Sequence, residues 1–492
     1  MTNSRALTLY IQLHRARRRS LLASGAIGAG LIATVGITVL NDGGFDTASQ
    51  SLFVALAGVA LLAACALDGR ALLSATRSRV ALALAALAAL SIASAAWTLD
   101  ERVAALQAGL AIGGYAAVFV TAGALARRIG PWWFSGAVAA LALIEAILGL
   151  HAVASHSLPY AERIGGVWRP GGSFEYSPAL AVLQLGALPT LCSLASRRSP
   201  AIAGAAGAWA VLAGAVLGLS ASRLGMAMAA ALLVGMILRP PAGSSQRSPA
   251  IATAGIVALG ALVAPSVLGE HDGLRAAAPG WQGLIRLAGL ALVCGVAWPL
   301  GRQARALRNR ILLASAACGV GLVLVLVLVM APRAHTAERT AHGASRHTSA
   351  LASHPAEFLH GRGGEWEAAL QTWSEHPAFG AGAGAYFAAS VRHQGSAPTL
   401  YAHDLPLELA AELGVAGLLL CVLLYTSTAA IVWRSVKGPA FWLLAPITVA
   451  FLVSNIVDWT WHLAGLGAVW AAAAGALQAD SERRPRRLRE VP

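Results

Sequence analysis

A histidine and three acidic residues stand at the start of a strongly apolar segment in the C-terminal third of the chain. The stretch from Tyr401 to Leu420 reads YAHDLPLELAAELGVAGLLL. Its acids Asp404, Glu408 and Glu412 are spaced by four, so they share one face of a helix. Ionisable groups at the mouth of a membrane helix are costly and usually functional. Since a histidine can take a proton from a hydroxyl group, we predict that His403 is a catalytic base.

Three arginines in polar segments could supply the complementary part of a site. They are Arg169 in VWRPGGSFEYSP, Arg223 in GLSASRLGMA and Arg362 in HGRGGEWE. Guanidinium groups grip phosphate oxygens in pairs, so converging arginines would bind a dense anion such as pyrophosphate. The predicted outer loops contain no Asp-x-Asp pair for a divalent metal. We therefore expect the arginines themselves to stabilise the leaving pyrophosphate, with no metal and no cofactor.

Each of these residues also has a simpler interpretation. Arg169 and Arg223 could extend to the membrane interface, although the apolar flanks of Arg223 favour a function. Arg362 taken alone fits a solvated loop residue, and His403 could be an interfacial side chain. For Asp404 we prefer the role of helix N-cap.

The composition is that of a polytopic membrane protein. Of 492 residues, 57% are hydrophobic and 12% are charged, whereas soluble domains have about 25% charged residues. All five cysteines fall in apolar stretches, so no disulfide framework is predicted. The fold class we predict is all-α, with about 14 transmembrane helices (12–14). The expected spans are 20–40, 51–67, 80–97, 103–126, 132–152, 177–195, 200–219, 222–238, 250–268, 283–300, 311–331, 405–433, 440–457 and 460–478.

The distribution of basic residues predicts the orientation. With the N-terminus in the cytoplasm, most of the 36 Lys and Arg residues fall on the inner side. The net charge of +14 is thereby explained by topology, and nucleic acid is not an expected partner. The predicted order is a cytoplasmic basic N-terminus (1–19), a membrane domain of about eleven helices (20–331), an extracytoplasmic loop (332–402), a membrane domain of about three helices (403–478) and a cytoplasmic basic tail (479–492).

The long loop 332–402 has two kinds of sequence. It contains seven of the 13 histidines at irregular spacing, which we interpret as solvated surface rather than metal ligands. Apolar residues at helical spacing predict an amphipathic helix near 364–375, on the membrane or over a cavity. Those residues are Trp366, Ala369, Leu370 and Trp373.

The helix is followed by GAGAGAY at 380–386. The glycines predict a flexible turn that brings backbone close to another part of the protein. A phosphate-binding loop is a weak alternative, because no Lys-Ser/Thr pair follows.

The order of motifs resembles the O-antigen ligase and polymerase superfamily of bacterial membrane glycosyltransferases. The similarity covers about residues 160–480. The matching segments are RPGGSF (169–174), SASRLGMAMA (220–229), GRGGEWEAALQTWSEHPAFGAGAGAY (361–386), AHDLPLELAAELGVAGLLL (402–420) and VDWTWHLAG (457–465).

The resemblance implies a helical fold whose large extracytoplasmic loop caps a lipid-facing cavity. It also implies metal-independent transfer of a glycan from undecaprenyl pyrophosphate to a glycan, lipid or protein acceptor, at the bacterial cytoplasmic membrane. By motif position, His403 would be the base, and Arg169 and Arg223 would face the pyrophosphate, with Arg362 a looser match. The supporting positions we assign are Glu408, Glu412, Trp366 and Asp458.

Two other classes of protein are compatible with many spans. A transporter or lipid-linked glycan flippase would often show inverted repeats and midplane charges. No repeat is evident, and Glu145 is the main internal charge. A scaffold for envelope assembly would tolerate replacement of His403 and Arg223.

Overall fold

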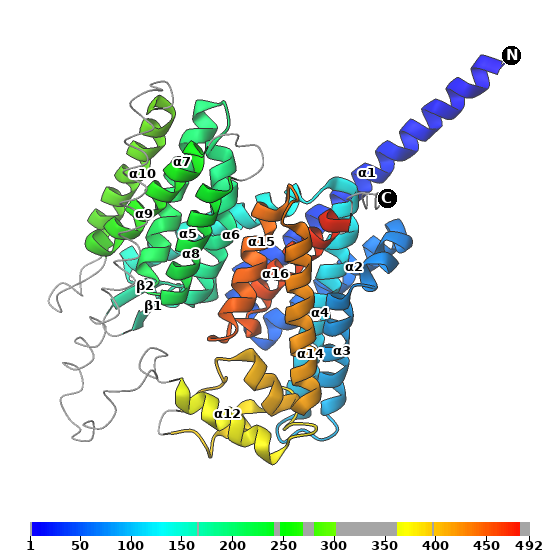
Figure 1. The fold of residues 1–492 in the computed structure, drawn as a ribbon, viewed down its shortest axis with the longest axis vertical. Coiled ribbons are helices and arrows are strands. Elements are labelled where there is room, and N and C mark those ends of the chain that lie inside the picture. Colours follow the sequence, from blue (N-terminus) through cyan, green and yellow to red (C-terminus); the bar gives the residue numbers. More distant parts are fainter. Residues whose placement is uncertain are drawn as a thin grey trace, which may run out of the picture. The chain divides into compact units, whose positions relative to one another are not determined.

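The structure is a computed structural model, and it describes residues 2–164, 167–240, 247–268, 280–301, 362–395 and 398–482 (Figure 1). The expected span 311–331 lies outside these residues. So does the histidine-rich first part of the long loop, up to residue 361.

Helices dominate the described part of the chain, as expected for a multi-pass membrane protein. Within it, nine helices are long and apolar enough to cross a membrane. Three more apolar helices are shorter, at Arg79–Ser94, Arg223–Leu238 and Phe441–Ser454. The count of fourteen spans and their orientation stay predictions. The all-α expectation misses a two-stranded hairpin, β1 (Ala161–Ile164) and β2 (Val167–Pro170).

The chain forms two compact units, each described here by itself. The first unit comprises Met1–Val39, Gly44–Phe134 and Gly364–Pro492. Its helices are α1 (Thr2–Leu40), α2 (Thr47–Thr76), α3 (Arg79–Ser94), α4 (Arg102–Ile129), α12 (Gly363–Glu375), α13 (Tyr386–Ser390), α14 (Leu405–Ser435), α15 (Phe441–Ser454) and α16 (Ala464–Glu482).

Helix α16 forms the centre of the first unit. Every residue from Ala464 to Asp480 is buried, and its main neighbour is α4. The two helices approach so closely that a Cβ at Gly475 would overlap the backbone of Phe119. Small residues permit such contact between membrane helices. This explains why an alanine-rich helix, rather than a strongly hydrophobic one, fills the interior.

Helix α14 is broken near its start, where the sequence predicts one continuous span over 405–433. Gly414 has φ 65° and ψ −156°, a conformation that other residues rarely adopt. The break releases two carbonyl groups from the helix ladder. Ala411 O accepts a hydrogen bond from Ala381 N (2.9 Å), and Glu412 O accepts one from Gly382 N (2.8 Å).

The segment that fills this break is the glycine-rich turn after α12. Its Gly382 has φ 102° and lies so close to Thr98 that a Cβ would overlap that residue. The next amide, Ala383 N, donates to Ser94 Oγ at 2.9 Å. The turn therefore joins α14 to the end of α3. Because these amides bond to protein, the turn is not a phosphate-binding loop.

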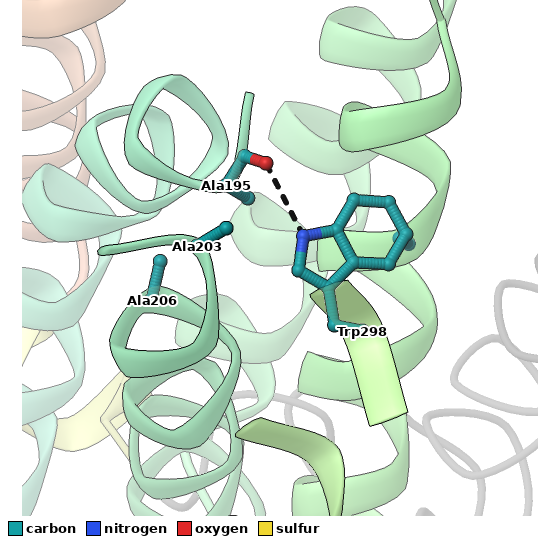
Figure 2. Close-up of a cluster of buried hydrophobic side chains, with 5 residues drawn as sticks. Ala195, Ala203, Ala206 and Trp298 are labelled. Carbon is teal, nitrogen blue, oxygen red and sulfur yellow. Dashed lines mark hydrogen bonds between the residues drawn. The ribbon is translucent and has the colours of Figure 1, made fainter. Parts of the chain in front are cut away.

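The second unit comprises Leu40–Gly43 and Ser135–Gly363. Besides the hairpin it contains α5 (Trp132–Ser155), α6 (Ser177–Ala195), α7 (Pro200–Leu219), α8 (Arg223–Leu238), α9 (Ser248–Leu268) and α10 (Trp281–Gly301). Glycines again set the packing, since a Cβ at Gly214 or Gly218 of α7 would overlap the α9 backbone. Figure 2 shows one buried cluster, where Trp298 Nε1 of α10 donates to Ala195 O at 3.2 Å beside Ala203.

Candidate active site

His403 occupies a fixed position directly before α14. Its backbone is left-handed, with φ 53°, a conformation that is uncommon outside glycine and frequent at functional sites. The next residue, Asp404, caps α14 by accepting a hydrogen bond from Leu407 N at 2.8 Å. The preferred interpretation of Asp404 as an N-cap is therefore confirmed. Burial raises the pKa of Asp404 to about 6.

The His403 ring is held at one nitrogen. His403 Nδ1 is in hydrogen-bonding contact with Tyr401 O at 3.1 Å and lies 2.9 Å from Glu365 Oε2. A carbonyl oxygen only accepts, so this arrangement favours the tautomer with the proton on Nδ1. The other nitrogen, Nε2, then has a free lone pair. A neutral imidazole oriented in this way is suited to act as a base.

The carboxylate beside His403 belongs to α12 and not to the acidic stripe of α14. Only 17% of the His403 side chain and 20% of the Glu365 side chain are exposed, so water screens this contact only in part. Tyr386 helps to hold α12, because its hydroxyl donates to Glu365 O at 3.0 Å. The sequence reasoning missed Glu365, since nothing in the spacing of residues indicates that α12 returns to the start of α14.

Helix α12 (yellow in Figure 1) covers the stretch where the apolar spacing predicts a helix. Its packed face differs from the expected one. The buried residues are Ala368, Ala369 and Thr372, and Leu370 is exposed. Small residues are buried because α12 packs against protein, in a cluster that includes Ala369, Tyr386 and Ala411. Trp366 is half-buried, and its Nε1 has no hydrogen-bond partner among the described residues.

The two glutamates of α14 hold the loops around His403. Glu408 Oε2 accepts a hydrogen bond from Ala402 N at 2.9 Å, and its Oε1 lies 2.5 Å from His462 Nε2. Glu412 Oε1 accepts from Tyr386 N at 3.1 Å. Both side chains are buried. Their partners are loop amides and a histidine, so these acids position backbone.

His462 is a second residue that sequence reasoning missed, although it lies in the VDWTWHLAG motif. Its ring stacks on Tyr401 with a centroid separation of 3.9 Å. Tyr401 also stacks on Trp459 at 5.4 Å. This aromatic group fixes the segment that leads into His403. Asp458, expected to support the site, accepts a hydrogen bond from Trp459 N at 2.8 Å.

Arg169 lies on the hairpin of the second unit, with Glu162 as its cross-strand partner. Its side chain is half-buried, and its Nε atom has no hydrogen-bond partner among the described residues. Burial lowers the pKa of Arg169, and the facing Glu162 charge opposes that effect. A buried guanidinium nitrogen that lacks a partner is the arrangement expected of an anion-binding arginine.

A buried glutamate anchors the loop after Arg169. Glu145 of α5 accepts hydrogen bonds from Ser173 N (2.8 Å) and from Ser173 Oγ (2.5 Å). Gly172 has φ 61°, and a Cβ there would overlap the Glu145 carboxylate. The main internal charge of the sequence therefore serves to fix the RPGGSF motif.

Arg223 is the first residue of α8. The helix is capped by Ser222, whose Oγ accepts from Gly225 N at 3.1 Å. A cation at this end opposes the helix dipole, so the position is unfavourable for the helix alone. Together with the dipole it creates a strongly positive end, which suits an anion.

Hydrogen bonds connect the surroundings of the two arginines within the second unit. Glu162, which faces Arg169, accepts from Ser177 N at 3.1 Å through Oε1. Ser177 Oγ in turn donates to Ser220 O at 3.2 Å, in the turn that leads to Arg223. Both arginines therefore stand at the same end of this unit. Arg362 directly precedes α12 and is half-buried.

Residues 280–422 match the family model described as O-antigen ligase. The matched segment contains Glu365, His403, Glu408 and Glu412, whereas Arg169, Arg223 and His462 lie outside it. No curated protein matches the chain.

Proposed function

Since the chain carries an O-antigen ligase domain and belongs to the O-antigen ligase superfamily, we propose that it is a glycosyltransferase of the bacterial cytoplasmic membrane. It moves a glycan from undecaprenyl pyrophosphate to an acceptor hydroxyl on the extracytoplasmic face. The acceptor is another glycan, a lipid or a protein, and no resident metal takes part.

The observation that supports this proposal most strongly is the contact of His403 with Glu365 inside the family segment. In the reaction, His403 Nε2 takes the proton of the acceptor hydroxyl. The acceptor oxygen attacks the anomeric carbon and forms the new glycosidic bond. The bond from that carbon to the phosphate oxygen breaks, and its electron pair leaves with the pyrophosphate. Direct displacement of this kind inverts the anomeric centre.

Charge stabilisation of the leaving group is the role we assign to Arg169 and Arg223. The negative charge on the departing pyrophosphate grows during bond breaking, so fixed guanidinium groups stabilise the transition state more than the ground state. The unpartnered Nε of Arg169 and the position of Arg223 at a helix N-terminus support this assignment. We predict that Arg169 and Arg223 act on the same donor as His403 and that Arg362 lies nearby.

Deletion of the gene, followed by analysis of carrier-linked and finished surface glycans, tests the function. A ligase deletion leaves unligated polymer on the carrier lipid, whereas a polymerase deletion leaves single units. A flippase deletion instead retains donor that cannot be labelled from outside the inner membrane. That last pattern, restored by complementation, would exclude the transferase function.

A further inference from the structure

A polar cavity lies at the end of the first unit that is remote from His403. It has a volume of about 420 Å³ and is bordered by the start of α3, the end of α14 and the end of α16. Its lining includes Arg77, Arg79 and Arg434, with Ser74, Gln478 and Glu482. The volume falls within the range of about 300–1,000 Å³ that is usual for small-molecule sites.

The same three helices connect this cavity with the catalytic end. Helix α14 begins beside His403 and rises about 30 Å from Gly414 to Arg434. Helix α3 runs from Arg79 to Ser94. Ser94 Oγ accepts the hydrogen bond from Ala383 N of the glycine-rich turn. Helix α16 begins just after His462 and reaches Gln478 near its other end. The cavity and His403 therefore lie at opposite ends of one bundle.

The floor of the cavity is a built hydrogen-bond network. Ser78 Oγ donates to Gln478 Oε1 at 2.7 Å and accepts from Val80 N at 3.2 Å. Gln478 Nε2 donates to Glu482 Oε1 at 2.8 Å. The only acid in the lining, Glu482, is paired with Arg127 at 2.5 Å. Arg127 therefore neutralises the charge of Glu482, and the three lining arginines are not needed for this.

The lining arginines leave a net positive charge that the described residues do not balance. Arg77, Arg79 and Arg434 make no ion pair within the described part of the chain. Among the described residues, the hydrogen-bond partner of Arg434 Nε is the backbone carbonyl of Ala430, at 3.1 Å. The first turn of α3 adds the positive end of a helix dipole. A phosphate group is the natural ligand for such a setting.

Apolar side chains beside the cavity indicate where the phosphate comes from. Trp433 is 81% exposed and Leu73 is 62% exposed, and each adjoins a residue of the lining. Tryptophan at the end of an apolar helix is typical of the membrane interface. A phosphate ester attached to acyl chains would contact both the arginines and these side chains, whereas free phosphate would contact the arginines alone.

We propose that this cavity binds the headgroup of an anionic phospholipid, through Arg77, Arg79 and Arg434, on the face of the membrane opposite to His403. Basic pockets between membrane helices commonly hold anionic headgroups on the cytoplasmic side. Under the orientation predicted from the sequence, the cavity faces the cytoplasm.

Lipid binding to the purified full-length protein in a neutral detergent tests the proposal. The probes are dioleoyl phosphatidylglycerol, dioleoyl phosphatidylcholine and inorganic phosphate. Native mass spectrometry detects their binding, and the ligand-dependent shift in melting temperature measures it independently. The wild type should prefer phosphatidylglycerol. The triple variant Arg77→Gln/Arg79→Gln/Arg434→Gln should bind it about 100-fold more weakly, because each arginine that contacts the bound headgroup contributes about a fivefold factor.

The matched control is the triple variant Arg197→Gln/Arg198→Gln/Arg239→Gln, which removes three exposed arginines of the other unit. It should bind phosphatidylglycerol with the wild-type affinity. The single variant Arg79→Gln, which changes one exposed side chain, should lose about fivefold even if the triple variant fails to fold. Equal losses in control and triple variant, or full displacement of the lipid by millimolar phosphate, would overturn the proposal. So would equal affinity for the two lipids.

Discussion

Glu365 of α12 places its Oε2 atom 2.9 Å from the Nδ1 atom of His403 at the mouth of α14. The contact joins the amphipathic helix α12 of the loop to the residue proposed as the base. Because Tyr401 O also contacts Nδ1, the ring has one orientation and its Nε2 atom is left for the substrate. A carboxylate in this place also stabilises the imidazolium that forms when the proton arrives.

Replacement of Glu365 should affect the rate of transfer more than donor binding. We expect Glu365→Ala to lower kcat by about 10–100-fold with an unchanged KM for the lipid-linked donor, since the imidazolium that forms in the reaction loses its neighbouring carboxylate. Glu365→Gln, which keeps the shape, should lose less. Steady-state kinetics measures both. Glu367→Ala, on the exposed side of α12, is the control. A rise in KM with constant kcat would place Glu365 in donor binding instead.

Glu408 should matter for stability rather than for the chemical step. Glu408→Ala removes the acceptor of Ala402 N and the partner of His462. Loss of a buried, hydrogen-bonded charge costs about 2–4 kcal/mol, so the melting temperature of the purified protein should fall by several degrees. The control Glu375→Ala breaks an exposed ion pair with Arg392. It should leave the melting temperature nearly unchanged. Equal melting temperatures for both variants would refute the anchoring role.

The two arginines of the second unit should not tolerate lysine. An ammonium group cannot make the bidentate contact of a guanidinium. Arg169→Lys and Arg223→Lys should therefore each reduce kcat/KM for the pyrophosphate-linked donor by about tenfold or more. Arg163→Lys is the matched control on the same hairpin, where Arg163 lies over the Trp168 ring. If all three variants keep wild-type kinetics, the arginines are interfacial residues.

Asp404 makes the stability depend on pH. Its raised pKa, about 6, means that the folded protein binds this proton more tightly than the unfolded chain. Stability from this group is therefore greatest at low pH and is lost as the pH rises from about 4 to 6. Asp404→Asn keeps the cap and removes the buried charge. It should stabilise the protein by about 1–3 kcal/mol at pH 8 and by little at pH 4. A pH-independent difference in melting temperature would exclude this account.

The sequence predicts most helices of the described part of the chain well, because long apolar runs leave few alternatives. It also locates the N-cap at Asp404, since capping depends on residues close in the chain. The break at Gly414 was not predicted. A single glycine within a hydrophobic run does not reveal that the turn at 380–384 supplies substitute hydrogen bonds.

Side-chain partners were harder to predict than helices. Nothing in the sequence indicates which acid lies beside the His403 ring. In the structure that acid is Glu365, which reaches His403 only because α12 packs on α14 through small residues such as Ala369. His462 was missed for a similar reason. Its pairing with Glu408 depends on the turn before α16, which leaves no periodic pattern.

The most direct measurement is the transfer of glycan from undecaprenyl pyrophosphate to acceptor by purified His403→Ala protein. We expect transfer to fall to background, while expression, melting temperature and donor binding stay near wild-type values, because only the base is removed. Glu412→Gln, which alters a buried anchor without removing its shape, should be milder. Transfer by His403→Ala at the wild-type rate would contradict the proposed mechanism.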